Sequence, residues 1–246
     1  LARAVSIRGE LDDLDADEQG AGELAEALRA AVAELARIGR RLVRARRKAS
    51  APFARAIEVE LEALGMPSVR LQVGMADDFA ADRVLEESSM HGPVPVEFMV
   101  RINPGLPPQS LRDTASGGET ARIVLAVKKC LADQDRVPFV AFDEIDAEIG
   151  GRLGLAVGRK LAEVAVDHQV LIVTHLPQVA AFADRHFKVS KSVDGGTTRT
   201  TIRALDARES EAELAAMAVG EGADGTALAE ARRLVERARE AGQSGV

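Results

Sequence analysis

The sequence predicts an α/β protein in which a parallel sheet flanked by helices follows a long coiled-coil helix. Two uniformly apolar segments, 137–142 and 170–174, have the composition of strands buried within a parallel sheet. Helical segments precede and separate these strands, an alternation that covers both faces of such a sheet. Apolar residues also repeat with a heptad period near the N-terminus. We therefore divide the chain into a coiled-coil arm, residues 1–64, and a second domain, residues 65–246.

Composition limits the classes of protein to which the chain can belong. Its 246 residues carry a net charge of -7 and are 46% hydrophobic, which is enough for a core and excludes wholesale disorder. No apolar segment approaches the roughly 18 residues of a membrane helix, so we expect no membrane partner. The one cysteine, Cys130, excludes an internal disulfide, fits a reducing cytoplasm and is expected to fill core space.

The arm is predicted from apolar residues spaced alternately by four and three. They are Leu24, Leu28, Ala31, Leu35, Ile38, Leu42, Ala45 and Ala49. A helix with this seam needs a second helix to cover it, and we expect that partner to lie outside this sequence. Acidic residues and two glycines predict a turn at 12–22, and Pro52 predicts an end or bend, because it lacks an N–H. A second helical stretch then runs to Leu64, with Gly65 as its cap.

The second domain begins with strands and continues as helices and strands in turn. Residues 69–73 and 94–100 alternate apolar and polar side chains and predict an antiparallel pair. A loop rich in proline and glycine follows them. Further elements are predicted as helices at 118–133 and 151–166, a hairpin of strands 187–191 and 198–204 around Asp194-Gly195-Gly196, and closing helices at 211–219 and 226–241.

Ser116-Gly117-Gly118-Glu119 lies at the start of a predicted helix. A helix N-terminus presents unpaired N–H groups and a partial positive charge, and two glycines let the backbone approach a phosphate closely. The same residues also suit an ordinary helix cap, with Ser116 as the N-cap and Glu119 at the third helical position. The motif alone leaves both interpretations open.

Asp143 and Glu144 follow the predicted strand 137–142 directly. In open α/β sheets, ligands bind outside the carboxyl ends of the strands. Asp143 is suited to hold Mg²⁺ through water, and Glu144 to orient or deprotonate a water that attacks phosphorus. The alternative is that Asp143 caps the next helix and Glu144 is only solvated.

His175 ends the next predicted strand, 170–174. Its imidazole is suited to bond a γ-phosphate or a water, although a structural histidine is the favoured interpretation of this residue alone. A parallel sheet would bring His175 to the same edge as Asp143 and Glu144, so the motifs together predict a phosphoryl-transfer site. A Gly-x-x-x-x-Gly-Lys-Ser/Thr loop is absent from the 246 residues, so we expect this chain alone to bind nucleotide weakly or not at all.

Five motifs carry a resemblance to a known protein family. They are Asn103-Pro104-Gly105, Ala115 to Glu119, Phe142 to Asp146, Ile149 to Arg152, and Thr174 to Ala180. From about residue 24 to about residue 240, the sequence resembles the C-terminal half of the RecN family, bacterial DNA-repair ATPases related to SMC proteins within the ABC ATPase superfamily. The resemblance implies an ABC/SMC-type P-loop NTPase head, of which residues 65–246 are the C-terminal lobe. The phosphate-binding lysine loop, Walker A, belongs to an N-terminal lobe outside this chain.

The resemblance also implies a role for each motif residue. Asp143 matches the Walker B aspartate that holds Mg²⁺, Glu144 the catalytic glutamate, and His175 the switch histidine. Asp146 matches the aspartate of the D-loop. The signature residues contact ATP bound to the opposite subunit and are Ser116, Gly117, Gly118 and Glu119.

Two positions depart from the family pattern. Ala115 replaces the leucine of the common ABC signature, and Ala147-Glu148 stands where Thr-Gly is expected. The second departure bears on the contacts that the D-loop makes.

The resemblance implies an intact protein that hydrolyses ATP with Mg²⁺ between two heads, in recombinational repair of DNA double-strand breaks. The implied partners are a second head, the missing N-terminal half and DNA, and the implied location is the bacterial cytoplasm, at the nucleoid. Two alternatives stay open. One is a non-catalytic dimerisation or docking module, and the other is the head lobe of another SMC or ABC-type ATPase, against which residues 174–180 argue.

Seven basic residues with no acid among them lie late in the arm. They are Arg37, Arg40, Arg41, Arg44, Arg46, Arg47 and Lys48. Arg40, Arg44 and Arg47 are candidate contacts to a DNA backbone. A solvated helix flank that complements the helix dipole is the slightly favoured alternative.

Overall fold

The computed structural model describes residues 2–76, 84–113, 116–132, 134–194, 197–220 and 222–243. Contacts between residues divide the chain into two compact units, one formed by residues 1–52 and 72–98 and the other by residues 53–71 and 99–246. The division into an arm up to residue 64 and a lobe from residue 65 is a functional one and stays a prediction.

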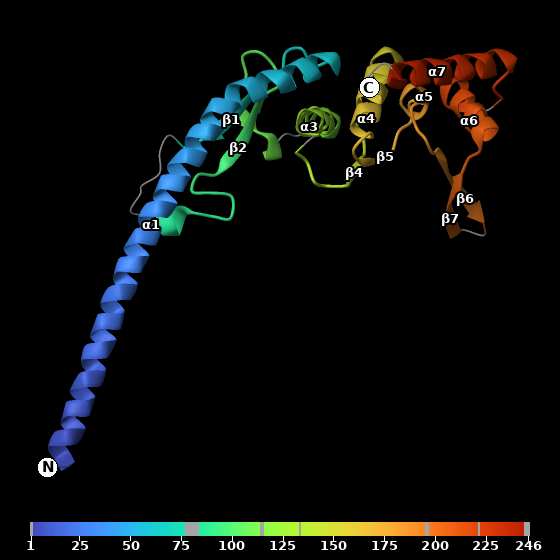
Figure 1. Ribbon diagram of the computed structural model, residues 1–246. Helices are drawn as coiled ribbons and strands as arrows, with labels where there is room; N and C mark the ends of the chain where they lie inside the picture. The colour runs from blue at the N-terminus through green and yellow to red at the C-terminus, as the bar shows by residue number, and fades with distance from the viewer. Residues whose placement is uncertain are drawn as a thin grey trace. The chain divides into compact units, whose positions relative to one another are not determined.

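Helix α1 is one continuous helix, Ala2–Ala63, with Pro52 inside it (Figure 1). The predicted turn at 12–22 is therefore wrong, because a glycine costs a helix only about 1 kcal/mol relative to alanine and its neighbours are helix formers. Pro52 does not end the helix either, although the division between the two units falls directly after it. Beyond it, Ile57 and Leu61 are fully buried and favour continuation of the helix.

Gly65 ends α1 as predicted. Its φ of +78° is in the left-handed region, where glycine carries no Cβ penalty. The amide of Met66 donates to the Leu61 carbonyl at 2.9 Å, which satisfies one of the last carbonyls of the helix. A Cβ at Gly65 would lie 2.5 Å from Cδ2 of Leu153, so the Leu153 side chain would have to shift.

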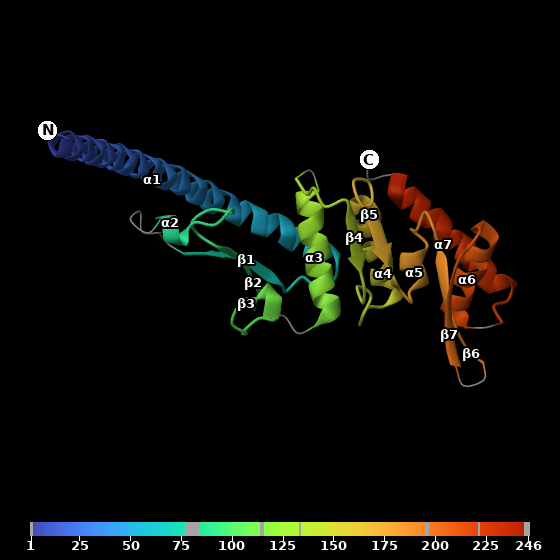
Figure 2. The same ribbon diagram turned by 90° about the horizontal axis from the view of Figure 1, so that it is seen from below.

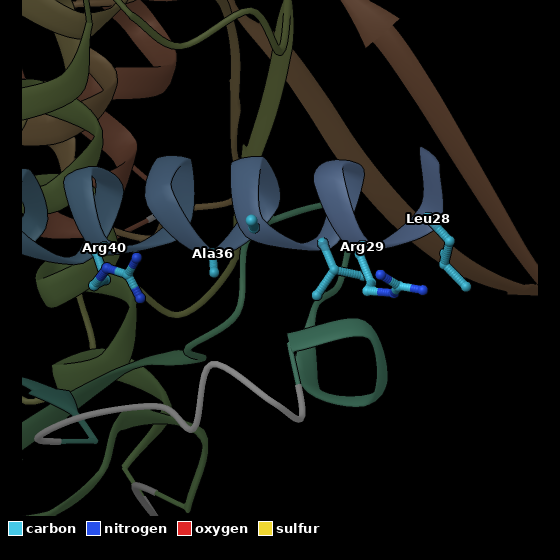
Figure 3. Close-up of a pocket in the computed structure, with 6 residues that line it drawn as sticks. Leu28, Arg29, Ala36 and Arg40 are labelled. Atoms are coloured by element: carbon cyan, nitrogen blue, oxygen red, sulfur yellow. The ribbon is translucent and has the colours of Figure 1, made fainter. Parts of the chain in front are cut away.

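In the first unit, α1 packs mainly through residues that lie beside the heptad seam. Ala36 and Val43 form a small core with Val94. The seam residues Leu24 and Ile38 stay 72% and 49% exposed, whereas Leu35 packs against this core. The seam is thus covered only in part by the described residues, and a partner helix outside this chain stays a prediction. An open groove of about 450 Å³ runs along this part of the helix, where labelled side chains project from one side (Figure 3). Its lining residues are Leu28, Arg29, Val32, Ala33, Ala36 and Arg40.

A three-stranded sheet has the order β1-β2-β3. Strands β1, Arg70–Met75, and β2, Val96–Arg101, confirm the two predicted alternating segments. The short β3, Gln109–Ser110, pairs antiparallel with β2 and was not predicted, because it lies in a proline-rich loop. The short helix α2, Val84–Glu87, was not predicted either.

The predicted parallel α/β arrangement is confirmed in the second unit. Helix α3, Gly117–Leu131, precedes β4, Phe139–Phe142, and α4, Gly151–Val164, precedes β5, Gln169–Ile172 (Figure 2). β4 and β5 pair in parallel, with Phe139 opposite Gln169 and Phe142 opposite Ile172. This pairing brings the carboxyl ends of both strands to one edge. Asp133, at the predicted end of the first helix, lies outside the described residues.

One face of this small sheet is open. Val140 and Phe142 point to the buried side, with 9% and 4% exposure. Phe139, Leu171 and Val173 alternate to the other side and are 46%, 50% and 61% exposed. The expected cover on both faces is therefore wrong for the described residues, because the second layer that these apolar side chains require is not among them.

The C-terminal part consists of a hairpin and three helices. Strands β6, Phe187–Asp194, and β7, Thr197–Ala204, pair antiparallel and confirm the predicted hairpin, whose Gly195 and Gly196 lie outside the described residues. The helices are α5, Pro177–Ala180, α6, Ala207–Val219, and α7, Gly225–Gln243. α6 begins with a complete capping box between Asp206 and Glu209. No helix of the described part of the chain is long and apolar enough to cross a membrane.

Candidate functional site

The loop after β4 carries both predicted strand-end carboxylates at the surface. Asp143 and Glu144 are exposed, and Oδ1 of Asp143 accepts a hydrogen bond from the Glu144 amide at 3.0 Å. Glu144 has a φ of +58°, a left-handed conformation that costs a non-glycine residue roughly 1–2 kcal/mol. Such strain gathers at functional sites, where the surrounding structure holds it in place.

Asp146 connects this loop to the end of β5. Its side chain is buried, and its Oδ2 accepts hydrogen bonds from the Thr174 hydroxyl and, at 3.0 Å, from the His175 amide. The same oxygen lies 3.2 Å from Nδ1 of His175, whose side chain is 73% exposed. The structure thus brings Asp146 and His175 together at the sheet edge, with the imidazole open to solvent.

The N-terminus of α3 packs against the same loop. Ser116 is the N-cap, and its hydroxyl accepts from the Glu119 amide at 3.4 Å, which confirms the capping interpretation. A Cβ at Gly117 would lie 2.6 Å from Oε2 of Glu144. A Cβ at Gly118 would lie 2.9 Å from the Ala147 Cβ and 3.1 Å from the Glu144 carbonyl oxygen. The glycine pair therefore permits a close approach between this helix and the loop.

Arg122 is a part of this arrangement that the sequence analysis missed. It lies on α3 with 6% exposure, and its Nη1 donates to the carbonyls of Ile145, at 3.4 Å, and Ala147, at 3.2 Å. The available signal was an arginine within an apolar helix segment, three residues after Glu119 and therefore on the same face.

The loop after β4 has a second left-handed residue besides Glu144. Glu148 has a φ of +63°, at the position where the family pattern has glycine. The backbone at this position has a left-handed conformation, which glycine would adopt without strain. Ala115, the other departure, lies outside the described residues.

The described residues contain no cluster of three His, Cys, Asp or Glu side chains that could hold a metal ion. Mg²⁺ commonly binds proteins through one or two carboxylates, with waters and phosphate oxygens completing its shell. The exposed Asp143 at the strand end fits one such ligand.

The basic run on α1 divides into engaged and free side chains. Arg46 donates to the carbonyls of His91 and Val94, and Arg47 donates to the Ala76 carbonyl at 2.9 Å. Arg40 and Arg44 are exposed and have no hydrogen-bond or ion-pair partner among the described residues. Of the three candidate DNA contacts, Arg47 therefore has a structural task in the first unit.

No protein-family model matches the chain. Curated relatives, in contrast, match most of it. DNA repair protein RecN of Streptomyces coelicolor is 40% identical over 212 residues, which are 84% of this chain and 37% of that protein. RecN of Deinococcus radiodurans is 38% identical over 226 residues, which are 92% of this chain and 38% of that protein. The chain thus spans less than two fifths of the length of these two relatives.

SMC head structures are also similar, with low identity. The Smc head domain of Pyrococcus yayanosii, solved with a coiled coil and joint, aligns with a TM-score of 0.44 and 20% identity, covering 66% of this chain and 28% of that one. A structure from work on ATP-driven dimerization of SMC ATPases aligns with a TM-score of 0.41 and 19% identity, covering 69% and 93%. On the strength of the RecN relatives, the chain belongs to the RecN family of DNA repair proteins and corresponds to its C-terminal part.

Proposed function

We propose that this chain is the C-terminal half of a RecN-type ATPase head and supplies one side of an ATP site that forms between two heads. The observation that carries the proposal is the contact set of Asp146, which joins the loop after β4 to Thr174 and His175 at the end of β5. Burying a carboxylate costs free energy unless hydrogen bonds compensate it. A buried carboxylate that links two strand ends supports a site held ready for chemistry.

Within this proposal, each group at the sheet edge has a defined task. Asp143 holds Mg²⁺ through water, and the bound ion would offset the negative charge of the phosphates. Glu144 orients the attacking water and accepts its proton as the water oxygen bonds to the γ-phosphorus, while the bond from that phosphorus to the bridging oxygen breaks and ADP leaves. Asp146 orients the imidazole of His175 through Nδ1, which leaves Nε2 to face the γ-phosphate.

The signature residues act across the interface in this proposal. The start of α3, from Ser116 to Glu119, would contact the triphosphate held by the opposite head, where its N–H groups and partial positive charge favour an anion. ATP then joins the two heads, and hydrolysis releases them. Closure of the heads would couple the nucleotide state to the coiled coils and to double-strand break repair.

The N-terminal half of the protein is the proposed partner for the open face of β4 and β5. Phe139, Leu171 and Val173 would be covered by that lobe, which would also supply the missing lysine loop. The same open face supports the second candidate, a docking module without catalysis. The upstream reading frame separates the two, since a Walker A loop several hundred residues before Leu1 supports the ATPase.

Glu144→Gln in the full-length protein tests the catalytic assignment. We expect ATP turnover to fall by about 100-fold or more, because amide nitrogen and oxygen cannot accept the proton, while ATP-driven pairing of heads persists. Steady-state phosphate release and size-exclusion chromatography with ATP measure the two effects. Turnover at the parental rate would remove Glu144 from the role of base.

Charge reversal on α1 tests whether the arm contacts DNA. If Arg40 and Arg44 bind phosphates, Arg40→Glu with Arg44→Glu weakens DNA binding and lowers the salt slope by about 2. Arg37→Glu is the matched control, because Arg37 is already paired with Glu34. Binding measured across several salt concentrations with an unchanged slope would retire these two contacts.

A further inference from the structure

Arg122 is a buried cation that none of the motif roles explains. It stands among the buried residues of α3 next to Ile123, Leu125 and Ala126. Burial lowers the pKa of its guanidinium, against the opposing influence of Glu119 and Glu148. Moving a guanidinium out of water is costly, so a buried arginine needs compensating bonds. Its bonds therefore indicate what the side chain does.

Those bonds hold the D-loop on both sides of Asp146. Nη1 reaches the carbonyls of Ile145 and Ala147, the two residues that flank the aspartate. The turn is closed from within by the Ala147 amide, which donates to the Glu144 carbonyl at 2.9 Å. The loop also approaches α3 closely at Gly117 and Gly118. Because the loop contains strained residues, it needs such external support.

A shift of this loop would be transmitted to the imidazole of His175. The Asp146 carboxylate accepts from Thr174 and His175, and the Glu144 backbone accepts from Ala147. Arg122 thus acts on the carbonyls of residues 145 and 147, and through them on the orientation of Glu144 and His175.

We propose that Arg122 is a positioning residue, which anchors the D-loop to the signature helix and thereby sets the orientation of His175 and Glu144. This inference rests on the proposed ATPase function for its kinetic consequence. The link from Arg122 to His175 is a property of the fold and holds without nucleotide.

The test uses the full-length protein with Arg122→Met, Arg122→Lys and the control Arg159→Met, which removes an exposed arginine from α4. We expect Arg122→Met to lower kcat by tenfold or more with less than a threefold change in KM for ATP. Lysine keeps one donor and should restore part of the rate, while the control retains the parental kcat. A kcat within twofold of the parent in a folded Arg122→Met protein would overturn the proposal. If Arg122→Met does not fold, a parental kcat for Arg122→Lys would overturn it instead.

A spectroscopic readout separates this inference from the proposed function. In protein labelled with ¹⁵N-histidine, the ring signal of His175, identified by its loss in His175→Gln, should move in the Arg122 variants and stay in Arg159→Met. If the parent hydrolyses no ATP, the proposed function fails, and this signal still decides the role of Arg122. A ring signal of His175 identical to the parent's in the Arg122 variants would overturn the inference.

Discussion

Gly118 is the residue at which α3 packs directly on the loop after β4. Gly118→Ala would place a methyl group 3.1 Å from the Glu144 carbonyl oxygen, which is backbone and cannot swing aside. We expect a loss of about 1–3 kcal/mol in the free energy of unfolding, from overpacking. Gly225→Ala is the matched control, because nothing lies within 4 Å of its added Cβ. Urea midpoints compare the two variants, and equal midpoints would contradict the packing described here.

At this scale, the sequence predicts residue types better than their contacts. Asp143, Glu144 and His175 could be selected because they follow apolar segments that predict the strands of a parallel sheet. The left-handed φ of Glu144 and the hydrogen bonds of Arg122 could not be predicted from the sequence. Both depend on how a loop folds against a helix that is distant in sequence. Ser116 acts as the helix cap that its sequence context allows, which was one of the two interpretations left open, since capping is a local interaction.

Four charged side chains join three helices at the level of the secondary-structure elements. Lys160 of α4 pairs with Glu60 of α1, at 2.7 Å, and with Glu163, at 3.1 Å, while Lys129 of α3 also pairs with Glu163. The network links the last turn of α1 to α3 through α4. We expect Lys160→Met to lower the free energy of unfolding by about 1–3 kcal/mol, because it leaves charged partners poorly solvated. Exposed Arg159→Met serves as the control in urea unfolding, and a Lys160→Met midpoint equal to this control's would contradict the role of the network.

The same network should give stability a defined pH dependence. Burial alone would raise the pKa of Glu163, but hydrogen bonds from Lys129 and Lys160 lower it below its ordinary 4.5. A lowered folded pKa gives a stabilisation that is present above about pH 4.5 and is lost as pH falls through the folded value. Urea midpoints between pH 3 and pH 7 should therefore converge for the parent and Glu163→Gln at the acid end. A constant difference between them across this range would contradict the assignment.

Elements with a strong local signal were predictable, and those that depend on tertiary contacts were not. The parallel pair β4 and β5 and the hairpin of β6 and β7 follow from apolar runs and turn residues. The turn predicted at 12–22 fails, because a few glycines and acids do not outweigh a long run of helix formers. Strand β3 has only two residues, which is too short for any pattern.

At the scale of the whole molecule, the chain has the features of half a site. The exposed apolar residues of β4 and β5, and the exposed seam residues Leu24, Leu28 and Ile38 of α1, are apolar surfaces of the kind that usually contact another protein segment. The sequence contains the carboxylates Asp143 and Glu144 after a strand and a glycine pair at a helix start, and it has no Gly-x-x-x-x-Gly-Lys-Ser/Thr loop. We infer that Asp143 and Glu144 support ATP hydrolysis only together with a lysine loop from the N-terminal half.

ATP turnover tests this claim most directly, measured for this chain alone, for the N-terminal half alone, and for the two together. Neither half is expected to release phosphate above background, because each lacks groups that the reaction needs. The combined halves should hydrolyse ATP, and Glu144→Gln in this chain should abolish that activity. Turnover by this chain alone, or a combined activity that survives Glu144→Gln, would contradict the account.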